Sequence, residues 1–401
     1  MLWAALAALS FFVVSHPREL LPDFSQSLLW LLCLSALVVI VDLRRVRPPA
    51  LSWPVVAFLG LCAASTLWSV DPGATTDALL LYGGVALLAC LIVGNIETGV
   101  LLSGIVWGAL LVTGVTLGSA LAGIEGAGGP VGEAPLLGMH GNRNIVSYTL
   151  VLGLAAALSL RPSGSARSRA VRQALRGLAT VVIVGGIYLA SSGTGLVAAA
   201  ALILVAGALS LSRWTRVFAT VPAKIIGAAV LASLLVVLFS LSGAVFELLG
   251  KRSDFSGRVP LWRAIVRVWE GAPVGGYGWG AVWPYSWFSP DVVSAPKAAI
   301  DAGSRTALVH GHNIVFDLLP QLGLLGVLVV VVMIGCSVGW LFVRLDERDY
   351  VVARWAVLGA AAILVNGVTE PMVSVPVGWF VLVTIVASSS SLRRRRARIS
   401  S

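Results

Sequence analysis

The sequence predicts an all-α, polytopic membrane protein with about twelve transmembrane helices and one long outward-facing loop that contains short amphipathic helices. Three observations support this prediction. Of the 401 residues, 58% are hydrophobic and only 11% are charged, which excludes an ordinary soluble domain. The apolar residues form runs that are separated by polar segments. Lysines and arginines collect in alternate segments between those runs, as they do in multi-pass membrane proteins.

The apolar runs divide the chain into four parts. Residues 1–246 hold nine predicted transmembrane helices, residues 247–312 form the external loop, residues 313–392 hold the last three helices, and residues 393–401 form a basic tail. Several runs are shorter than the roughly 20 residues that cross a bilayer upright. The twelve runs lie near residues 1–14, 27–41, 51–69, 79–94, 99–121, 145–160, 177–191, 194–211, 225–246, 321–343, 352–369 and 375–389.

The basic residues predict the orientation. If the N-terminus is cytoplasmic, the segments on that side hold 19 of the 28 lysines and arginines, whereas the short outer loops hold only Arg18 and Arg143. The others lie in the loop 247–312, which is too long to follow the positive-inside rule. Both termini are therefore predicted to be cytoplasmic, in an inner or plasma membrane. This clustering also accounts for the net charge of +10 without nucleic acid as a partner.

The sequence predicts no cofactor and no metal ion. The four cysteines lie within apolar runs, and no His, Asp or Glu cluster in the outer loops has metal-ligand spacing. No internal repeat of the kind that builds many transporters is visible, and ionisable residues inside the spans are few. The exceptions, Asp317 and Glu370, sit close to the outer surface. Any chemistry is therefore expected at the outer face.

The end of the long loop carries the first candidate site. His310 and His312 lie where the loop returns to an apolar helix, and Asn313 is a predicted N-cap. Asn313, Asp317 and Gln321 follow one another at i, i+4 and i+8, a polar stripe that is expected to face a wet cavity rather than lipid. The alternative is a helix start with two interfacial histidines that have no chemical role.

A second candidate lies earlier in the same loop, where residues 256–269 predict a short amphipathic helix. Its expected apolar face holds Trp262, Ile265, Val266 and Trp269. Arg258 precedes that face, where its guanidinium can bind a phosphate through two hydrogen bonds. The glycine-dense turn 273–280 has no lysine of a nucleotide-binding loop but suits a tight turn beside a substrate. The alternative is a basic helix that rests on lipid headgroups.

Together these segments resemble the O-antigen ligase and polymerase family. His312-Asn313 is followed after nine residues by Gly323-Leu324-Leu325-Gly326, which matches the family pattern of His-Asn/Ser, nine residues, Gly-x-x-Gly in full. The order of several weaker motifs makes the resemblance specific and extends it over most of the chain. These motifs are Ser256-Gly257-Arg258 with Trp262, Pro273 with Gly276-Tyr277-Gly278, Leu67-Trp68-Ser69-Val70-Asp71-Pro72, and Gly141-Asn142-Arg143-Asn144.

The resemblance implies a membrane glycosyltransferase that uses a polyprenyl-diphosphate-linked glycan, without nucleotide sugar or metal ion. His312 fills the motif position and is predicted to be the general base for an acceptor hydroxyl, with His310 as helper or gate. Arg258 is predicted to bind the diphosphate, and Asn313 and Asp317 to line the substrate site. No paired carboxylates at a usable spacing indicate a covalent, retaining route. Direct attack by the acceptor is therefore expected, and it would invert the anomeric centre.

The chain departs from the family in the outer hairpin between the seventh and eighth predicted spans. Members often place an arginine there, where residues 191–195 read Ser-Ser-Gly-Thr-Gly. One diphosphate contact must then come from elsewhere, and Arg143, Arg258 and Arg305 are the candidates. His16, in the first outer loop, and His140, just before Arg143, are further groups that can approach the same pocket.

Three classes of function stay open from the sequence. The first is a transferase that moves a lipid-linked glycan onto a glycan, a lipid or another hydroxyl acceptor, as a ligase or a polymerase. The second is a transporter or flippase of such a lipid, and the third is a non-catalytic membrane assembly partner. The expected partners are the donor, the acceptor and membrane lipids. The sequence does not separate ligase from polymerase.

Overall fold

The computed structural model describes residues 2–43, 46–124, 126–128, 135–161, 165–215, 258–285, 287, 292–304, 307–339 and 347–400. These ranges contain 13 α-helices, one short 3₁₀ helix and no strand. The elements are α1 (Leu2–Val14), α2 (Phe24–Val41), α3 (Trp53–Ser65), α4 (Pro72–Asn95), α5 (Thr98–Leu121), η1 (Gly138–His140), α6 (Arg143–Ser159), α7 (Ala166–Leu189), α8 (Gly193–Thr215), α10 (Arg258–Trp269), α11 (Ala295–Ser304), α12 (Ile314–Val338), α13 (Glu347–Gly367) and α14 (Pro376–Ser400).

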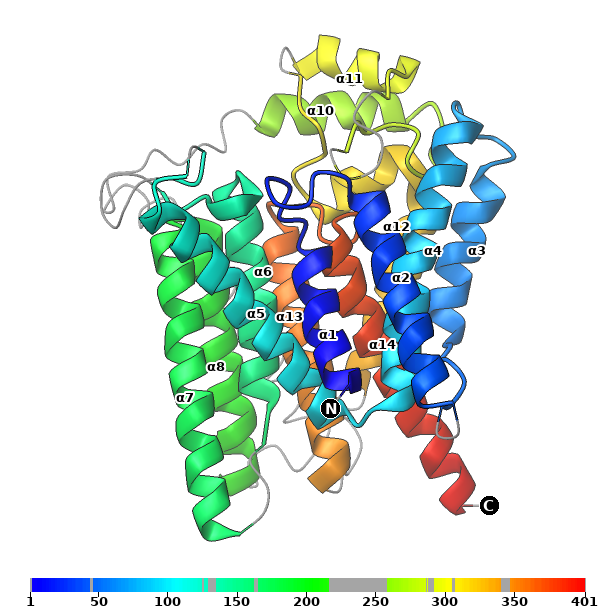
Figure 1. Cartoon of the computed structure of the whole chain (residues 1–401). Coiled ribbons are helices and arrows are strands. Elements are labelled where there is room, and N and C mark those ends of the chain that lie inside the picture. The colour runs from blue at the N-terminus through cyan, green and yellow to red at the C-terminus, as the bar shows by residue number, and fades with distance from the viewer. Residues whose placement is uncertain are drawn as a thin grey trace.

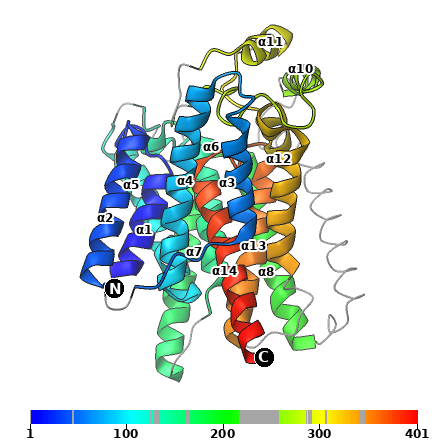
Figure 2. The ribbon, with the colours of Figure 1, turned by 90° about the vertical axis from the view of Figure 1, so that its right-hand side faces the viewer.

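The long helices run side by side in one bundle, and α10 and α11 lie across one end of it (Figure 1). Both chain termini lie at the opposite end, as the view turned by 90° also shows (Figure 2). The sequence predicts a short helix at residues 256–269, and α10 confirms it for residues 258–269, whereas residues 256 and 257 lie outside the described residues. A second short helix, α11, lies within residues 247–312, the segment predicted to be the long loop.

The apolar helices confirm an all-helical, multi-pass membrane protein. Within the described residues, seven helices are long and apolar enough to cross a membrane, namely α2, α4, α5, α7, α8, α12 and α13, and α1, α3, α6 and α14 are shorter apolar helices. These helices coincide with all the predicted spans except the ninth, at residues 225–246, which lies outside the described residues. The count of twelve crossings stays a prediction.

Helices α1 and α5 approach closely because α5 presents glycines to α1. A Cβ atom on Gly104 would lie 2.7 Å from the Cβ of Ala7, and one on Gly108 would lie 2.7 Å from the carbonyl oxygen of Ala8. Two glycines four residues apart form the small-residue face with which membrane helices commonly pack. This contact fixes α1 and, with it, the loop that follows α1 at the same end of the bundle as α10.

Helix α12 is broken near its start, and a turn from the long loop fills the break. Pro320 lacks an N–H, and Gly323 takes φ 59° and ψ −155°, which is not a helical conformation. Unpaired backbone groups are costly away from water, and the turn 273–280 supplies their partners. The bonds run from the N–H of Tyr277 to the carbonyl of Pro320 (2.9 Å), Gly278 to Gln321 (2.9 Å), Leu324 to Pro273 (3.0 Å) and Leu325 to Val274 (3.2 Å).

Gly323→Ala is expected to destabilise the protein by more than about 1 kcal/mol. The new Cβ would lie 2.3 Å from the carbonyl oxygen of Val274, at a backbone conformation that favours glycine. The matched control is Gly335→Ala in the same helix, because nothing lies within 4 Å of its Cβ position. Thermal unfolding in detergent should show a lower midpoint for Gly323→Ala only. Equal midpoints for the two variants would contradict the described packing of the turn.

Candidate functional site

The turn that carries the two histidines joins α11 to α12 and is held at Gly311. The Gly311 N–H donates to Oδ1 of Asp317 (2.9 Å), and its carbonyl accepts from the indole N–H of Trp262 in α10 (3.0 Å). A Cβ atom at position 311 would lie 2.7 Å from the Asp317 nitrogen, so a glycine is required. His312 follows at φ +47°, a left-handed conformation that costs a non-glycine residue free energy. The histidine turn is therefore fixed in place by its neighbours.

The predicted N-cap of α12 is confirmed. Oδ1 of Asn313 accepts hydrogen bonds from the N–H groups of Val315 (2.8 Å) and Phe316 (3.2 Å). Its amide nitrogen donates to the carbonyl of Val368 (3.1 Å), in the segment between α13 and α14. One side chain therefore begins α12 and joins it to that segment, which spans residues 368–375.

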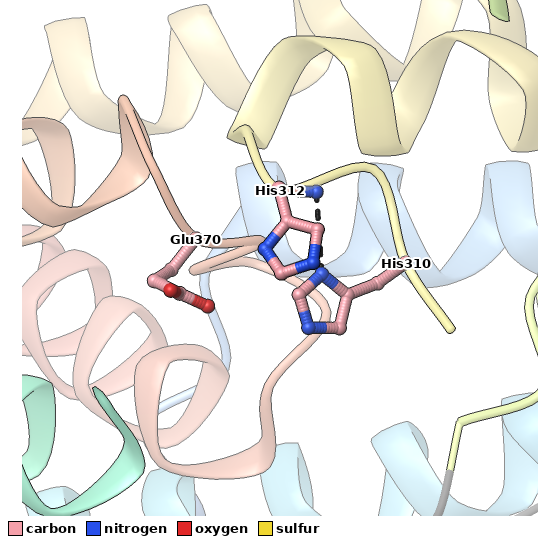
Figure 3. A group of neighbouring side chains, drawn as sticks. All are labelled: His310, His312 and Glu370. Atoms are coloured by element: carbon pink, nitrogen blue, oxygen red, sulfur yellow. Dashed lines mark hydrogen bonds between the residues drawn. The ribbon is translucent and has the colours of Figure 1, made fainter. Parts of the chain in front are cut away.

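Three side chains of types that can bind protons or metal ions meet at the histidine turn (Figure 3). His310, His312 and Glu370 each offer one ligand atom, and these atoms lie within 4.8 Å of one another. The two imidazole centroids are 3.9 Å apart, and the backbone N–H of His312 donates to Nδ1 of His310 (3.2 Å). In Figure 3 the two imidazole rings lie next to each other, and the carboxylate of Glu370 points toward them from a neighbouring segment. We call these three residues the triad.

Glu370 belongs to a hydrogen-bonded chain that includes the hairpin between α7 and α8. Its carboxyl is buried and accepts a bond from the amide of Asn144, at the start of α6 (2.9 Å). The Ser192 hydroxyl donates to Oδ1 of Asn144 (3.2 Å), and the Thr369 hydroxyl donates to that of Thr194 (3.2 Å). The hairpin therefore reaches the triad, with hydroxyl groups in the segment where family members often carry an arginine.

Burial and one arginine control the protonation of the triad. Burial raises the pKa of Glu370 to about 7, although the positive charge of Arg258 and the Asn144 bond lower it. Burial and the charge of Arg258 lower the pKa of His312 to about 4, against a backbone hydrogen bond to Thr369. Burial, His312 and Arg258 also lower the pKa of His310. At neutral pH both imidazoles are therefore uncharged, and Glu370 is close to its midpoint.

The polar stripe of α12 points into the protein. The sequence predicts that it faces a wet cavity, but Asp317 and Gln321 are fully buried and bonded to protein groups. The carboxylate of Asp317 accepts bonds from the Gly311 N–H, the hydroxyls of Tyr285 and Ser374, and the amide of Gln321. Gln321 in turn accepts a bond from the N–H of Gly280 (2.9 Å). These contacts connect the histidine turn, the long loop and segment 368–375, so Asp317 holds the site together.

The arginines with a predicted role are placed differently. Arg258 begins α10, and its charge acts on all three members of the triad. Arg143 begins α6 beside Asn144, and its side chain is exposed. Arg305 lies outside the described residues. Arg258 is therefore the candidate arginine that the structure brings to the histidines.

His16 and His140 form a separate pair in the loops after α1 and before α6. Nε2 of His140 is 2.9 Å from the Ser15 hydroxyl, and the His16 ring packs edge-on against Phe24. Burial lowers the pKa of His16 to about 4 and that of His140 to about 3. Their observed contacts join these two loops to each other, and the structure does not bring them into the triad.

A shallow groove of about 380 Å³ lies between α10 and α12 and adjoins the histidine turn. It is lined by Val259, Trp262, Arg263, Val266, Arg267 and Phe316. Trp262 stacks on Phe316 with ring centroids 5.0 Å apart, and it also bonds to Gly311. The face of α10 that is buried in the protein consists instead of Leu261, Ala264 and Ile265. The apolar face predicted for α10 is thus divided between the protein interior and this groove.

These features define a multi-pass membrane protein with a polar site at one end of its helix bundle, where a neutral histidine pair lies beside a buried carboxyl and an arginine. Residues 178–331 match the family model described as O-antigen ligase. The match includes α10, the turn 273–280 and the histidine turn, and it confirms the resemblance to the O-antigen ligase and polymerase family. It supports a role in glycan assembly of that type. A comparison with curated proteins gave no match.

Glu370→Gln is expected to raise stability at pH 8 and to leave it unchanged near pH 4. The pKa of this carboxyl is about 7 in the folded protein and 4.5 as a free group, so ionisation opposes folding as pH rises between these values. The full difference is at most about 3 kcal/mol. Glutamine keeps the oxygen that accepts from Asn144 but cannot ionise.

The matched control is Glu270→Gln, because Glu270 is exposed. Unfolding midpoints in detergent, measured from pH 4 to pH 8 for each variant and wild type, give the comparison. The gap between Glu370→Gln and wild type should widen with pH, whereas the control should follow wild type. If the difference in unfolding midpoint between Glu370→Gln and wild type does not change with pH, ionisation of Glu370 does not destabilise the folded protein.

Proposed function

We propose that this protein transfers a glycan from a polyprenyl-diphosphate carrier to an acceptor hydroxyl at the external face of the membrane. The observation that supports it best is the convergence of His310, His312 and Glu370 beside Arg258, within a chain that matches the O-antigen ligase model. The triad offers proton acceptors, and Arg258 offers positive charge. Acceptor attack and diphosphate departure need these two kinds of group.

Arg258 is the proposed diphosphate contact. A diphosphate leaves as a stable anion, so it needs positive charge and hydrogen-bond donors rather than a strong acid. The guanidinium can bind two phosphate oxygens at once. It begins α10 beside the histidine turn, where partial exposure leaves it accessible to a substrate. Arg143, at the start of α6 and next to Asn144, is the proposed second contact, and Arg305 stays a candidate.

His312 is the proposed general base. Its Nδ1 is buried and has no hydrogen-bond partner among the described residues, so in the tautomer protonated on Nε2 this nitrogen keeps a lone pair for an acceptor hydroxyl that enters the site. The acceptor oxygen attacks the anomeric carbon while its proton passes to Nδ1, and the bond from that carbon to the diphosphate oxygen breaks. The electron pair of the broken bond leaves with the diphosphate. One direct displacement of this kind inverts the anomeric centre.

Donor binding is expected to strengthen this base. In the free protein Arg258 opposes protonation of both histidines. A bound diphosphate neutralises that guanidinium and adds negative charge, which raises the pKa of His312 and makes the imidazole more basic. Glu370, with a pKa of about 7, is the proposed acceptor of the proton in the next step, and Asn144 orients it. Proton transfer is then coupled to donor binding.

The remaining predicted site residues are assigned to positioning. Asp317 holds Gly311, and Asn313 begins α12 and bonds to segment 368–375, so both fix the backbone of the triad. His310 is the proposed helper of His312, because the two rings are in contact. This mechanism uses arginine charge and requires no metal ion or other cofactor.

His312→Ala tests the function. Loss of a general base is expected to lower the turnover rate by about 10²–10⁴-fold while donor affinity persists. The assay combines purified protein in vesicles, a polyprenyl-diphosphate-linked glycan and an acceptor, and follows released polyprenyl diphosphate. Added imidazole should restore part of the lost rate. Loss of donor binding with an unchanged rate per bound donor would make His312 a binding residue, and bilayer crossing of the donor without its cleavage would indicate a transporter.

The proposed orientation places α10, α11 and the triad outside and both termini in the cytoplasm. Ser165 and Val293 are exposed at the start of α7 and just before α11, respectively. In a variant that lacks the four native cysteines, Val293→Cys in intact cells should react with an impermeant thiol reagent, and Ser165→Cys should react only after permeabilisation. The reverse pattern, or equal reaction of both, would contradict this orientation.

A further inference from the structure

The triad has the composition of a transition-metal site. Two imidazoles and one carboxylate, with a fourth position left open, form a common ligand set for zinc and related ions. Around a tetrahedral zinc ion, with bonds of about 2.0–2.1 Å, ligand atoms lie about 3.4 Å from one another. The ligand atoms of His310, His312 and Glu370 lie within 4.8 Å of one another (Figure 3), so side-chain rotations that shorten these distances would bring them to that spacing.

Each member of the triad offers one ligand atom. Nδ1 of His312 is buried and has no partner among the described residues, whereas Nδ1 of His310 accepts the 3.2 Å bond from the backbone N–H of His312, which a metal ion at that atom would replace. Asn144 holds one oxygen of Glu370 and is itself bonded to Ser192, as outer-shell groups orient a ligating carboxylate. His310 and His312 are partly exposed as whole residues, although Nδ1 of His312 is itself buried.

Arg258 restricts which ions can bind. Its positive charge repels any dication in the triad, so a purely ionic attraction to the single carboxylate is weak. Zinc, cobalt, nickel and copper also gain from bonds to imidazole nitrogen, whereas magnesium and calcium prefer oxygen ligands. The ligand set and the nearby arginine together select for the first group. The same repulsion makes binding reversible rather than structural.

We propose that His310, His312 and Glu370 bind a zinc-class divalent ion, and that this ion inhibits the protein. The bound ion occupies the lone pair that His312 needs as a base, and it places positive charge where the acceptor loses its proton. Binding of the ion follows from the triad alone. Inhibition rests on the proposed function, so the two parts are measured separately.

Cobalt is the probe for binding, because a tetrahedral cobalt site has strong visible absorption. Purified full-length protein that carries no polyhistidine tag should bind one equivalent of cobalt, and zinc should displace it. His310→Gln and Glu370→Gln should each weaken cobalt binding at least 10-fold. The matched control is Glu270→Gln, an exposed carboxyl outside the triad, which should bind cobalt as wild type does. Unfolding midpoints confirm that each variant is folded.

The absence of a cobalt spectrum in folded wild-type protein, or a spectrum that both triad variants retain, would overturn the inference. In the transfer assay, zinc should inhibit wild-type protein, EDTA should restore the rate, and magnesium should do neither. Transfer that zinc does not affect would overturn the inhibitory role and leave the proposed function intact. A triad that binds cobalt in a protein without transfer activity would support the metal site and contradict the proposed function instead.

Discussion

The buried carboxylate of Asp317 is the interaction on which the site depends. It lies one turn inside α12 and accepts bonds from the histidine turn, the long loop and segment 368–375, through Gly311, Tyr285 and Ser374. A buried carboxylate is costly unless its oxygens are bonded, and here four donors surround it. Removal of that carboxylate would free three segments at once. The triad is assembled from two of these segments, so its geometry is a consequence of Asp317.

The break in α12 makes this arrangement possible. In a continuous helix the backbone carbonyls accept hydrogen bonds from N–H groups of the same helix. Pro320 and Gly323 interrupt this pattern in α12 and leave backbone groups that form hydrogen bonds with the turn 273–280. The long loop is thereby attached to a transmembrane helix at the level of Gln321 and, through Trp262, at Gly311. Helix α10 and Arg258 are consequently held over the start of α12. Two features that resemble defects in a helix therefore position the charged end of the site.

Local features of the site were predictable from the sequence, and long-range ones were not. Asn313 is predictable as an N-cap because capping is set by neighbouring residues, and α10 because its apolar spacing is helical. The sequence places Glu370 near the outer surface but does not connect it to the histidines, since packing of α13 and α14 against α6 and α12 brings it there. The wet cavity predicted beside the stripe of α12 is wrong, because Asp317 and Gln321 are buried and bond to the side chain of Tyr285 and the backbone of Gly280.

The left-handed backbone at His312 has a consequence for how this sequence can change. At φ +47° a glycine or asparagine would fit with less strain, and selection for stability alone would favour one of them at this position. The chain instead keeps a bulky imidazole there, and Gly311 beside it carries the tight contact with Asp317. A substitution of His312 that increased the stability of the protein would therefore also remove the imidazole, which constrains how this position can change.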